Sequence, residues 1–210
     1  AELFRMSFTD ASPGMEEQWV GLKNYARVIA DPEFQATLLR NVAFVVTVVG
    51  LEMSIGLGIA LLLENPIPLR GLWLALIVAP YAVSPIVAVV MWKYMLDPNF
   101  GIVNFMIGRA GLPTVAWFTS AATSMAGVVV IAVWKEFSFV TIVSFAALKA
   151  IPIDFVEAAR VDGAGYRQVL RYVKLPMILP ALSIVMMFRI IYTLREFAIV
   201  HTTTGGGPGT

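Results

Sequence analysis

Four long apolar stretches limit what this sequence can fold into. They lie at about 41–63, 71–96, 122–148 and 177–200, and each approaches or exceeds the ~20 residues that a helix needs to cross a bilayer core. Lipid cannot hydrogen-bond to a peptide backbone, and each stretch is too long for a strand of a membrane barrel. We therefore predict an all-α membrane protein with four transmembrane helices in this chain.

The composition agrees with a multi-pass integral membrane protein. Hydrophobic residues make up 59% of the chain and charged residues 14%, against about 25% charged in ordinary soluble domains. The net charge of +1 gives no basis for binding nucleic acid. The sequence has no cysteine, and His201 is its single histidine, so we expect neither a disulfide nor a metal site.

A basic insert separates the third and fourth apolar stretches and sets the predicted topology. It spans 149–176 and contains five basic residues, whereas the 97–121 loop of similar length contains only Arg109. By the positive-inside rule, the insert is cytoplasmic. Successive spans cross the membrane in opposite directions. This places 64–70 on the cytoplasmic side and 1–40, 97–121 and 201–210 on the outer side.

The polar segment 1–40 is expected to be an external juxtamembrane segment with an amphipathic helix around 22–38, ahead of a transmembrane domain at 41–210. Because both ends are predicted to lie outside, we expect one further span on each side. The tail at 202–210 would then be a flexible external connection.

The insert is predicted to form two short helices joined by a turn. Asp154 precedes Glu157 by three residues, which is a capping-box spacing, so the first helix should begin near Phe155. Gly163 supplies a left-handed turn that ends this helix. A second short helix should follow over 165–173 and stop before the next proline.

Two segments of the insert resemble the Glu-Ala-Ala loop of ABC importer permeases. They read EAARVDGA at 157–164 and VKLP at 173–176, where the family tail reads Ile-x-Leu-Pro and Val173 is a conservative replacement. The segments GLKNY at 21–25 and GGGP at 205–208 narrow the resemblance to permeases of maltose-type carbohydrate importers.

The resemblance implies a type I importer permease fold with six spans in the full protein. It implies ABC ATPase subunits that hold ATP and Mg²⁺, a second permease subunit, an external solute-binding protein, and a carbohydrate, polyol or glycerol phosphate as cargo. No cofactor would bind to this chain. The residues that would couple to the ATPase are Asp154, Glu157, Ala158, Ala159, Asp162, Gly163, Leu175 and Pro176.

Three of the four apolar stretches carry charges at their midpoints. These are Glu52 in the first, Lys135 with Glu136 in the third, and Arg189 in the fourth. A charge at the centre of a membrane helix costs about 2.5–3.5 kcal/mol on insertion scales, so each needs a partner or a function. Two interpretations stay open: pairing that only holds helices together, and the lining of a water-filled translocation path.

Helical spacing groups further polar residues with Arg189. At about 100° per residue, Tyr192 and Glu196 share its helix face, whereas Arg195 points about 120° away. Aromatic rings beside charges suit carbohydrates, whose apolar faces stack on aromatics. The candidate residues of a translocation path are therefore Glu52, Lys135, Glu136, Arg189, Tyr192 and Glu196.

Two patterns concern helix geometry rather than chemistry. Pro80 and Pro85 lie inside the second stretch and are predicted to kink it. Gly50, Ser54 and Gly58 recur at four-residue spacing, which is typical of close packing between membrane helices.

Three functions could explain this combination of apolar stretches, midpoint charges and basic insert. A permease subunit of an ATP-driven importer explains the insert, and the sequence lacks a GxxxxGK[ST] phosphate loop, so ATP would be hydrolysed by a partner. An ion-coupled secondary transporter or channel would use Glu52, Glu136 and Glu196 as ion sites but leaves the insert without a role. An intramembrane enzyme fits worst, because no catalytic constellation is evident and no catalytic residue is expected.

Overall fold

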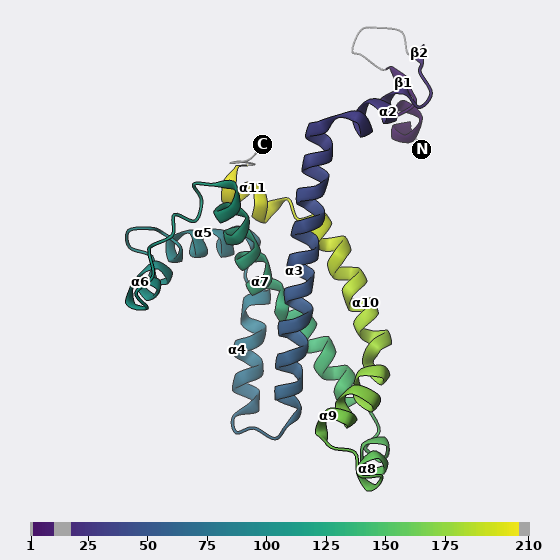
Figure 1. Cartoon of the computed structure of the whole chain (residues 1–210), viewed down its shortest axis with the longest axis vertical. Coiled ribbons are helices and arrows are strands. Elements are labelled where there is room, and N and C mark those ends of the chain that lie inside the picture. Colours follow the sequence, from purple (N-terminus) through teal and green to yellow (C-terminus); the bar gives the residue numbers. More distant parts are fainter. Residues whose placement is uncertain (1, 11–17, 206–210) are drawn as a thin grey trace. The chain divides into compact units, whose positions relative to one another are not determined.

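The computed structural model describes residues 2–10 and 18–205, and these form two compact units, Ala1–Ala43 and Phe44–Thr210. The predicted all-α membrane class is confirmed. The described residues also contain one antiparallel pair of two-residue strands. Figure 1 shows the elements in chain order. Residues 206–208 of the GGGP segment, and the end of the expected tail, lie outside the described residues.

The first unit is held together by the GLKNY segment. Helix α1 (Glu2–Met6) precedes strand β1 (Thr9–Asp10), which pairs antiparallel with β2 (Gln18–Trp19), and helix α2 (Lys23–Ala30) follows. The Asn24 side-chain amide donates to the carbonyl oxygens of Ser7 and Thr9, at 3.1 and 3.0 Å. Gly21 has φ +56°, which a glycine adopts without strain.

One amphipathic helix was expected around 22–38, but the chain breaks at Asp31. The proline at position 32 disfavours helical backbone at the residue before it, and Asp31 has ψ 117°. Pro32 then begins the 33-residue helix α3 (Pro32–Glu64), and the Asp31 carboxylate accepts the N–H of Glu33 at its start.

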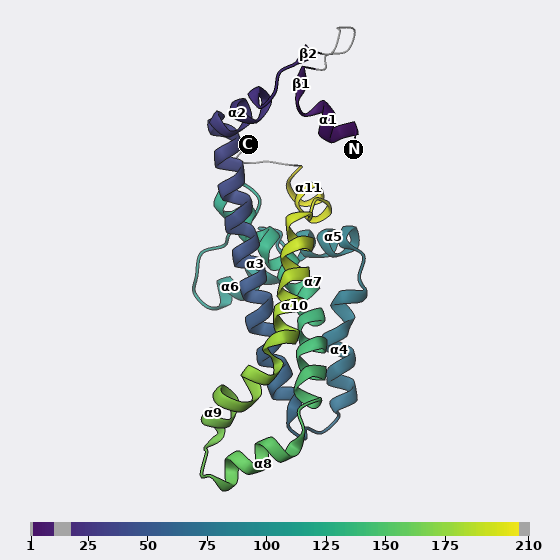
Figure 2. The same ribbon diagram turned by 90° about the vertical axis from the view of Figure 1, so that its right-hand side faces the viewer.

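The second unit contains the rest of the helices, and α4, α7 and α10 run beside the C-terminal part of α3 (Figures 1 and 2). After α3 the elements are α4 (Arg70–Ala82), α5 (Pro85–Met95), α6 (Ile102–Arg109), α7 (Ala121–Lys149), α8 (Ile153–Val161), α9 (Tyr166–Val169), the π-helical turn η1 (Leu170–Lys174), α10 (Leu175–Leu194) and α11 (Ala198–Thr204). Among the described residues, three helices are long and apolar enough to cross a membrane, and four if α4 and α5 count as one span.

The prolines of the second apolar stretch do more than kink it. Helices α4 and α5 meet at an angle of 103°. Val83 and Ser84 adopt extended backbone, with ψ 132° and 142°, because Pro85 disfavours helical backbone at Ser84. The Ser138 hydroxyl on α7 donates to the carbonyl of Ile77 at 2.5 Å and so fixes the end of α4 against α7.

The first half of the insert differs in one detail from the prediction. Helix α8 begins at Ile153 with Pro152 as its N-cap, so Asp154 lies inside the first turn and the predicted capping by Asp154 is wrong. Gly163 has φ +83°, and the next N–H, that of Ala164, donates to the carbonyl of Ala159 at 2.9 Å. This is the Schellman arrangement that glycine permits at a helix end.

The second half of the insert does not stop before Pro176, which corrects the prediction. Residues 166–194 form one continuous helical segment. The N–H of Leu175 donates to the carbonyl of Leu170, five residues earlier, which widens the helix into a π turn. The wider turn reduces the clash that a proline ring makes with the preceding carbonyl in a regular α-helix.

The fourth apolar stretch ends earlier than expected. Helix α10 stops at Leu194, and a short break precedes α11. Residues 202–204, expected in a flexible tail, belong to α11.

Two apolar clusters form the core of the second unit. One joins α3, α5, α7 and α11 through residues such as Val48, Val89, Ile131 and Ile199. The other joins Ala60, Leu148, Ile178 and Leu182 of α3, α7 and α10.

Helices α3 and α7 approach closely at Gly56, where an added Cβ would lie 2.7 Å from Val140. The stripe predicted for packing, Gly50, Ser54 and Gly58, is exposed in this chain instead.

Candidate functional site

Four charged side chains from three helices form one connected ion-pair network, which we call the central network (Glu52, Lys135, Glu136, Arg189). Arg189 Nε and Nη2 donate to Glu52 Oε2 and Oε1 at 2.8 and 2.9 Å. Arg189 Nη1 donates to Glu136 Oε2 at 2.9 Å. Lys135 Nζ lies 2.7 Å from Glu136 Oε1. The midpoint charges of α3, α7 and α10 are thus brought together, as their common depth in the sequence predicts.

Burial makes this pairing necessary. Glu52 is 0% exposed and Arg189 7%. Charges removed from water are tolerated when their partners and geometry compensate, and the two-pronged contact of a guanidinium with a carboxylate is the strongest such pair. With two carboxylates and two cations, the formal charge of the network is zero.

A cavity of about 830 Å³ opens beside the central network. Its wall comes from the α4–α5 break, α7 and the end of α10. The lining residues are Tyr81, Ala82, Val83, Ser84, Pro85, Lys135, Glu136, Phe139, Phe188, Arg189, Tyr192, Arg195 and Glu196. The break therefore shapes one side of the cavity, and the charges form the other.

Aromatic and ionic groups alternate on this wall. The rings of Tyr81 and Phe139 stack with their centres 6.0 Å apart, and Lys135 Nζ lies 5.5 Å from the centre of the Tyr81 ring. Flat apolar faces next to fixed hydrogen-bonding groups suit a ligand that has both, such as a sugar.

Five of the six path candidates line this cavity, and Glu52 differs from them. Its carboxylate is fully buried against Arg189. Arg195, which the helical projection directed away, lines the cavity as well, because α10 ends at Leu194 and the projection no longer applies. Glu196 Oε1 accepts the N–H of Ile199 at 3.1 Å and so caps α11.

The cavity-lining residues missed by sequence reasoning include those of the break, from Tyr81 to Pro85. Their signal was present in the two prolines, but a proline marks where a helix is disturbed and not which side chains the disturbance exposes.

The residues expected to couple to a partner form a separate surface at the other end of α7. Figure 2 shows α8 at the lower end of the bundle. Asp154, Glu157, Ala158, Asp162, Gly163 and Pro176 are exposed, and Ala159 and Leu175 are half-buried. Val156 anchors α8 from its buried face, while Phe155 and Val161 are 55% and 88% exposed. This surface exposes small, apolar and acidic side chains next to one another.

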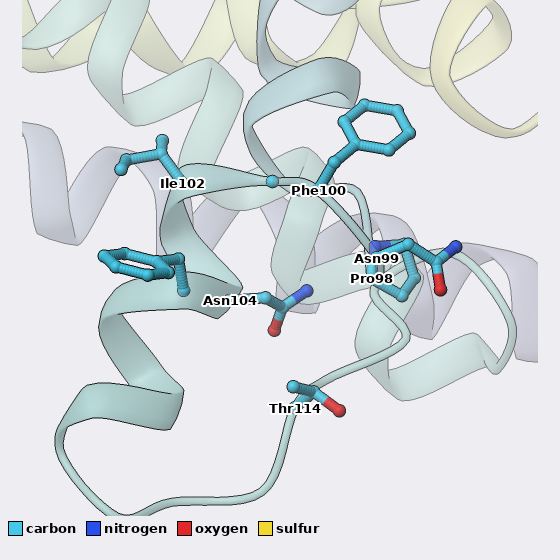
Figure 3. A pocket seen from close by; sticks show the side chains of 8 residues that line it. Pro98, Asn99, Phe100, Ile102, Asn104 and Thr114 are labelled. Carbon is cyan, nitrogen blue, oxygen red and sulfur yellow. The ribbon is translucent and has the colours of Figure 1, made fainter.

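A second hollow, of about 420 Å³, lies in the α5–α6 connection and has a structural explanation. Asn104 extends from α6 toward the segment that carries Thr114 (Figure 3). Its amide nitrogen bonds to the carbonyls of Leu96, Asp97 and Val115, and its oxygen accepts the N–H of Val115 at 2.9 Å. The buried Asn104 therefore holds the loop together.

Comparison with known proteins places these features in a family. Residues 52–210 match the family described as binding-protein-dependent transport system inner membrane component. The chain is 35% identical over 194 residues to the trehalose/maltose transport system permease protein MalF of Thermococcus litoralis, covering 92% of this chain and 66% of the relative. It is 30% identical over 198 residues to the sn-glycerol-3-phosphate transport system permease protein UgpA of Yersinia pseudotuberculosis, covering 93% and 66%. The chain thus spans about two thirds of the length of these relatives.

A solved structure has the same fold. It is a bacterial ABC transporter involved in the import of the acidic polysaccharide alginate, with a TM-score of 0.72 at 21% identity. The match covers 96% of this chain and 73% of the other.

Proposed function

Since this chain belongs to the family of binding-protein-dependent transport system inner membrane components, we propose that it is a permease subunit of an ATP-driven importer for a sugar, a polyol or a glycerol phosphate. The observation that carries the proposal is the family match over 52–210, which includes both the cavity and α8. The names of the relatives, which include trehalose/maltose and sn-glycerol-3-phosphate permeases, support this range of cargo.

In this proposal the cavity is part of the translocation path. Its aromatic rings contact the apolar faces of the cargo, and Lys135, Glu136 and Tyr192 offer donors and acceptors to hydroxyl groups. An ion-coupled transporter has less support, because two of its three candidate ion sites, Glu52 and Glu136, are already paired with Arg189.

Helix α8 is the proposed contact for a separate ATPase subunit, which holds ATP and Mg²⁺. Ala158 and Ala159 allow a partner to approach closely, and the exposed Phe155 adds apolar area. Gly163 fixes the direction in which the chain leaves α8. A second permease subunit and an external solute-binding protein would complete the importer.

Two substitutions test this assignment. In Gly163→Val, a β-branched residue at φ +83° is strained by about 1–3 kcal/mol, so the end of α8 should change direction. Ala159→Asp places a charge in the contact. We expect both variants to insert into the membrane but to lose the ATPase on co-purification and to lose solute uptake.

Gly165→Ala is the matched control, because Gly165 has φ −73° and an added Cβ meets only the Gln168 side chain at 3.7 Å. This variant should keep both the ATPase and uptake. Retained ATPase and normal uptake in Gly163→Val and Ala159→Asp would overturn the assignment of α8.

A further inference from the structure

A second cluster of charges joins the ends of the same helices as the central network, and we call it the loop-end cluster (Glu64, Lys149, Lys174). Lys174 Nζ lies 2.5 Å from Glu64 Oε1. Lys149 Nζ donates to the backbone carbonyl of Glu64 at 3.2 Å. Glu64 is the last residue of α3, Lys149 the last of α7, and Lys174 the last before α10.

The two clusters tie α3, α7 and α10 together at two levels. Glu64 follows Glu52 by 12 residues on α3, and Lys149 follows Glu136 by 13 on α7. Arg189 follows Lys174 by 15 residues on the continuous helix. At 1.5 Å per residue, these separations are about 18–22 Å. The loop-end cluster thus lies where the insert meets the bundle, and the central network lies beside the cavity.

The π turn places Lys174 in this position. Residues 170–174 form the turn, and Lys174 is its last residue, only 8% exposed. Such turns inside α-helices occur frequently at functional sites. The turn connects α9, and through it Gly163 and α8, directly to α10. A displacement of the insert can therefore reach Lys174 along the continuous helix, and Glu64 through the ion pair of these two residues.

We propose that Glu64 and Lys174 are positioning residues that transmit movement of the insert to α3, and through α3 to the central network and the cavity. This inference rests on the proposed function of the insert as the ATPase contact. Without the pair, the insert would still bind the ATPase and α10 would still move, but the end of α3 next to the insert would no longer follow. ATP hydrolysis would then be uncoupled from transport.

The test uses the complete importer in proteoliposomes with its solute-binding protein. ATP hydrolysis and solute uptake are measured on the same preparation for Glu64→Gln and Lys174→Gln. We expect both variants to keep the ATPase and to hydrolyse ATP, while uptake per ATP falls about tenfold, within the usual range of coupling between sites. The charge-swapped double variant Glu64→Lys/Lys174→Glu should recover part of this ratio, which a general packing defect would not.

Arg171→Gln is the matched control. It removes a cation from the same π turn, but Arg171 is exposed and has no ion pair among the described residues. Its uptake per ATP should stay unchanged.

Unchanged uptake per ATP in both single variants would overturn the inference, as would equal losses in Arg171→Gln or no recovery in the double variant. Loss of the ATPase from the single variants would also overturn it, because the pair would then act in docking. If the unaltered complex shows no ATP-dependent uptake, the proposed function itself fails, and the two failures are thereby distinguished.

Discussion

The central network and the loop-end cluster join the same three helices but differ in burial. Glu52 has no exposed side-chain surface and receives two bonds from one guanidinium, whereas the Glu64 side chain is 20% exposed and binds a flexible lysine. A bidentate pair has one geometry, whereas a lysine makes a single contact through a flexible side chain and can follow a partner that moves. The central network is therefore the more rigid of the two contacts, and the ion pair of Glu64 and Lys174 is the more adaptable.

Removing Arg189 should have the largest effect. Arg189→Ala leaves the buried Glu52 carboxylate without its partner, which costs about 3–5 kcal/mol when a buried pair is broken. This depth of burial predicts that Arg189→Ala loses both transport and assembly. Thermal unfolding of the purified complex measures the effect.

The double variant Glu52→Leu/Arg189→Leu separates charge from packing. Replacing both partners by apolar residues should restore most of the stability, because Glu136 keeps Lys135 as its partner and no charge of the central network is left unpaired. If Arg189→Ala and the double variant unfold at the same temperature, the central network is not held by ion pairing.

A methyl group at Gly56 should have an intermediate effect, because Gly56 lies between the two clusters on α3. The Cβ of Gly56→Ala would meet Val140 at 2.7 Å and the Phe137 carbonyl at 3.0 Å. Overpacking of this kind costs about 1–3 kcal/mol. We expect a lower unfolding temperature together with reduced uptake per ATP.

Gly58→Ala controls for glycine removal on the same helix, since no described atom lies within 4 Å of its added Cβ. The free energy of unfolding of Gly58→Ala should be unchanged or higher by up to about 1 kcal/mol, because alanine favours a helix over glycine. A Gly56→Ala protein as stable as Gly58→Ala would show that the α3–α7 contact adjusts freely.

Neutralising Glu136 should have the smallest effect on stability. Its side chain is 13% exposed and borders the cavity, and Glu136→Gln keeps an oxygen acceptor for Arg189 or Lys135. We expect a loss of about 1 kcal/mol or less in stability and a roughly fivefold slower uptake, equivalent to about 1 kcal/mol in the barrier.

Unfolding and ATP-dependent uptake are compared on one preparation, with the exposed Glu33→Gln as control. Unaltered uptake in Glu136→Gln would show that this carboxylate stabilises the helices but has no role in transport.

Local signals in the sequence predict that the chain is an all-α membrane protein, and they predict how far along each helix the charged residues lie. Apolar length identifies a membrane helix, and residue number fixes how far along the helix Glu52 or Arg189 lies. The side on which a charge faces depends on neighbouring helices, so the difference between the buried Glu52 and the cavity-lining Glu136 could not be predicted. Gly56 was missed for the same reason, since its partner Val140 is on another helix.

The effect of each proline on the backbone was the hardest feature to predict from the sequence. Pro85 and Pro176 both follow apolar or helical segments, yet one lies at a bend of 103° and the other in a continuous helix. A proline removes one N–H and restricts the preceding residue. Whether the backbone then bends or widens into a π turn depends on the packing around it, which the local sequence does not specify.

The zero formal charge of the central network determines how membrane voltage acts on it. A single elementary charge that crosses the membrane field gains or loses about 2.3 kcal/mol per 100 mV. Two carboxylates and two cations that move together carry no net charge through that field. A joint displacement of α3, α7 and α10 therefore moves no net charge at the level of the central network, and membrane voltage does no net work on these four side chains.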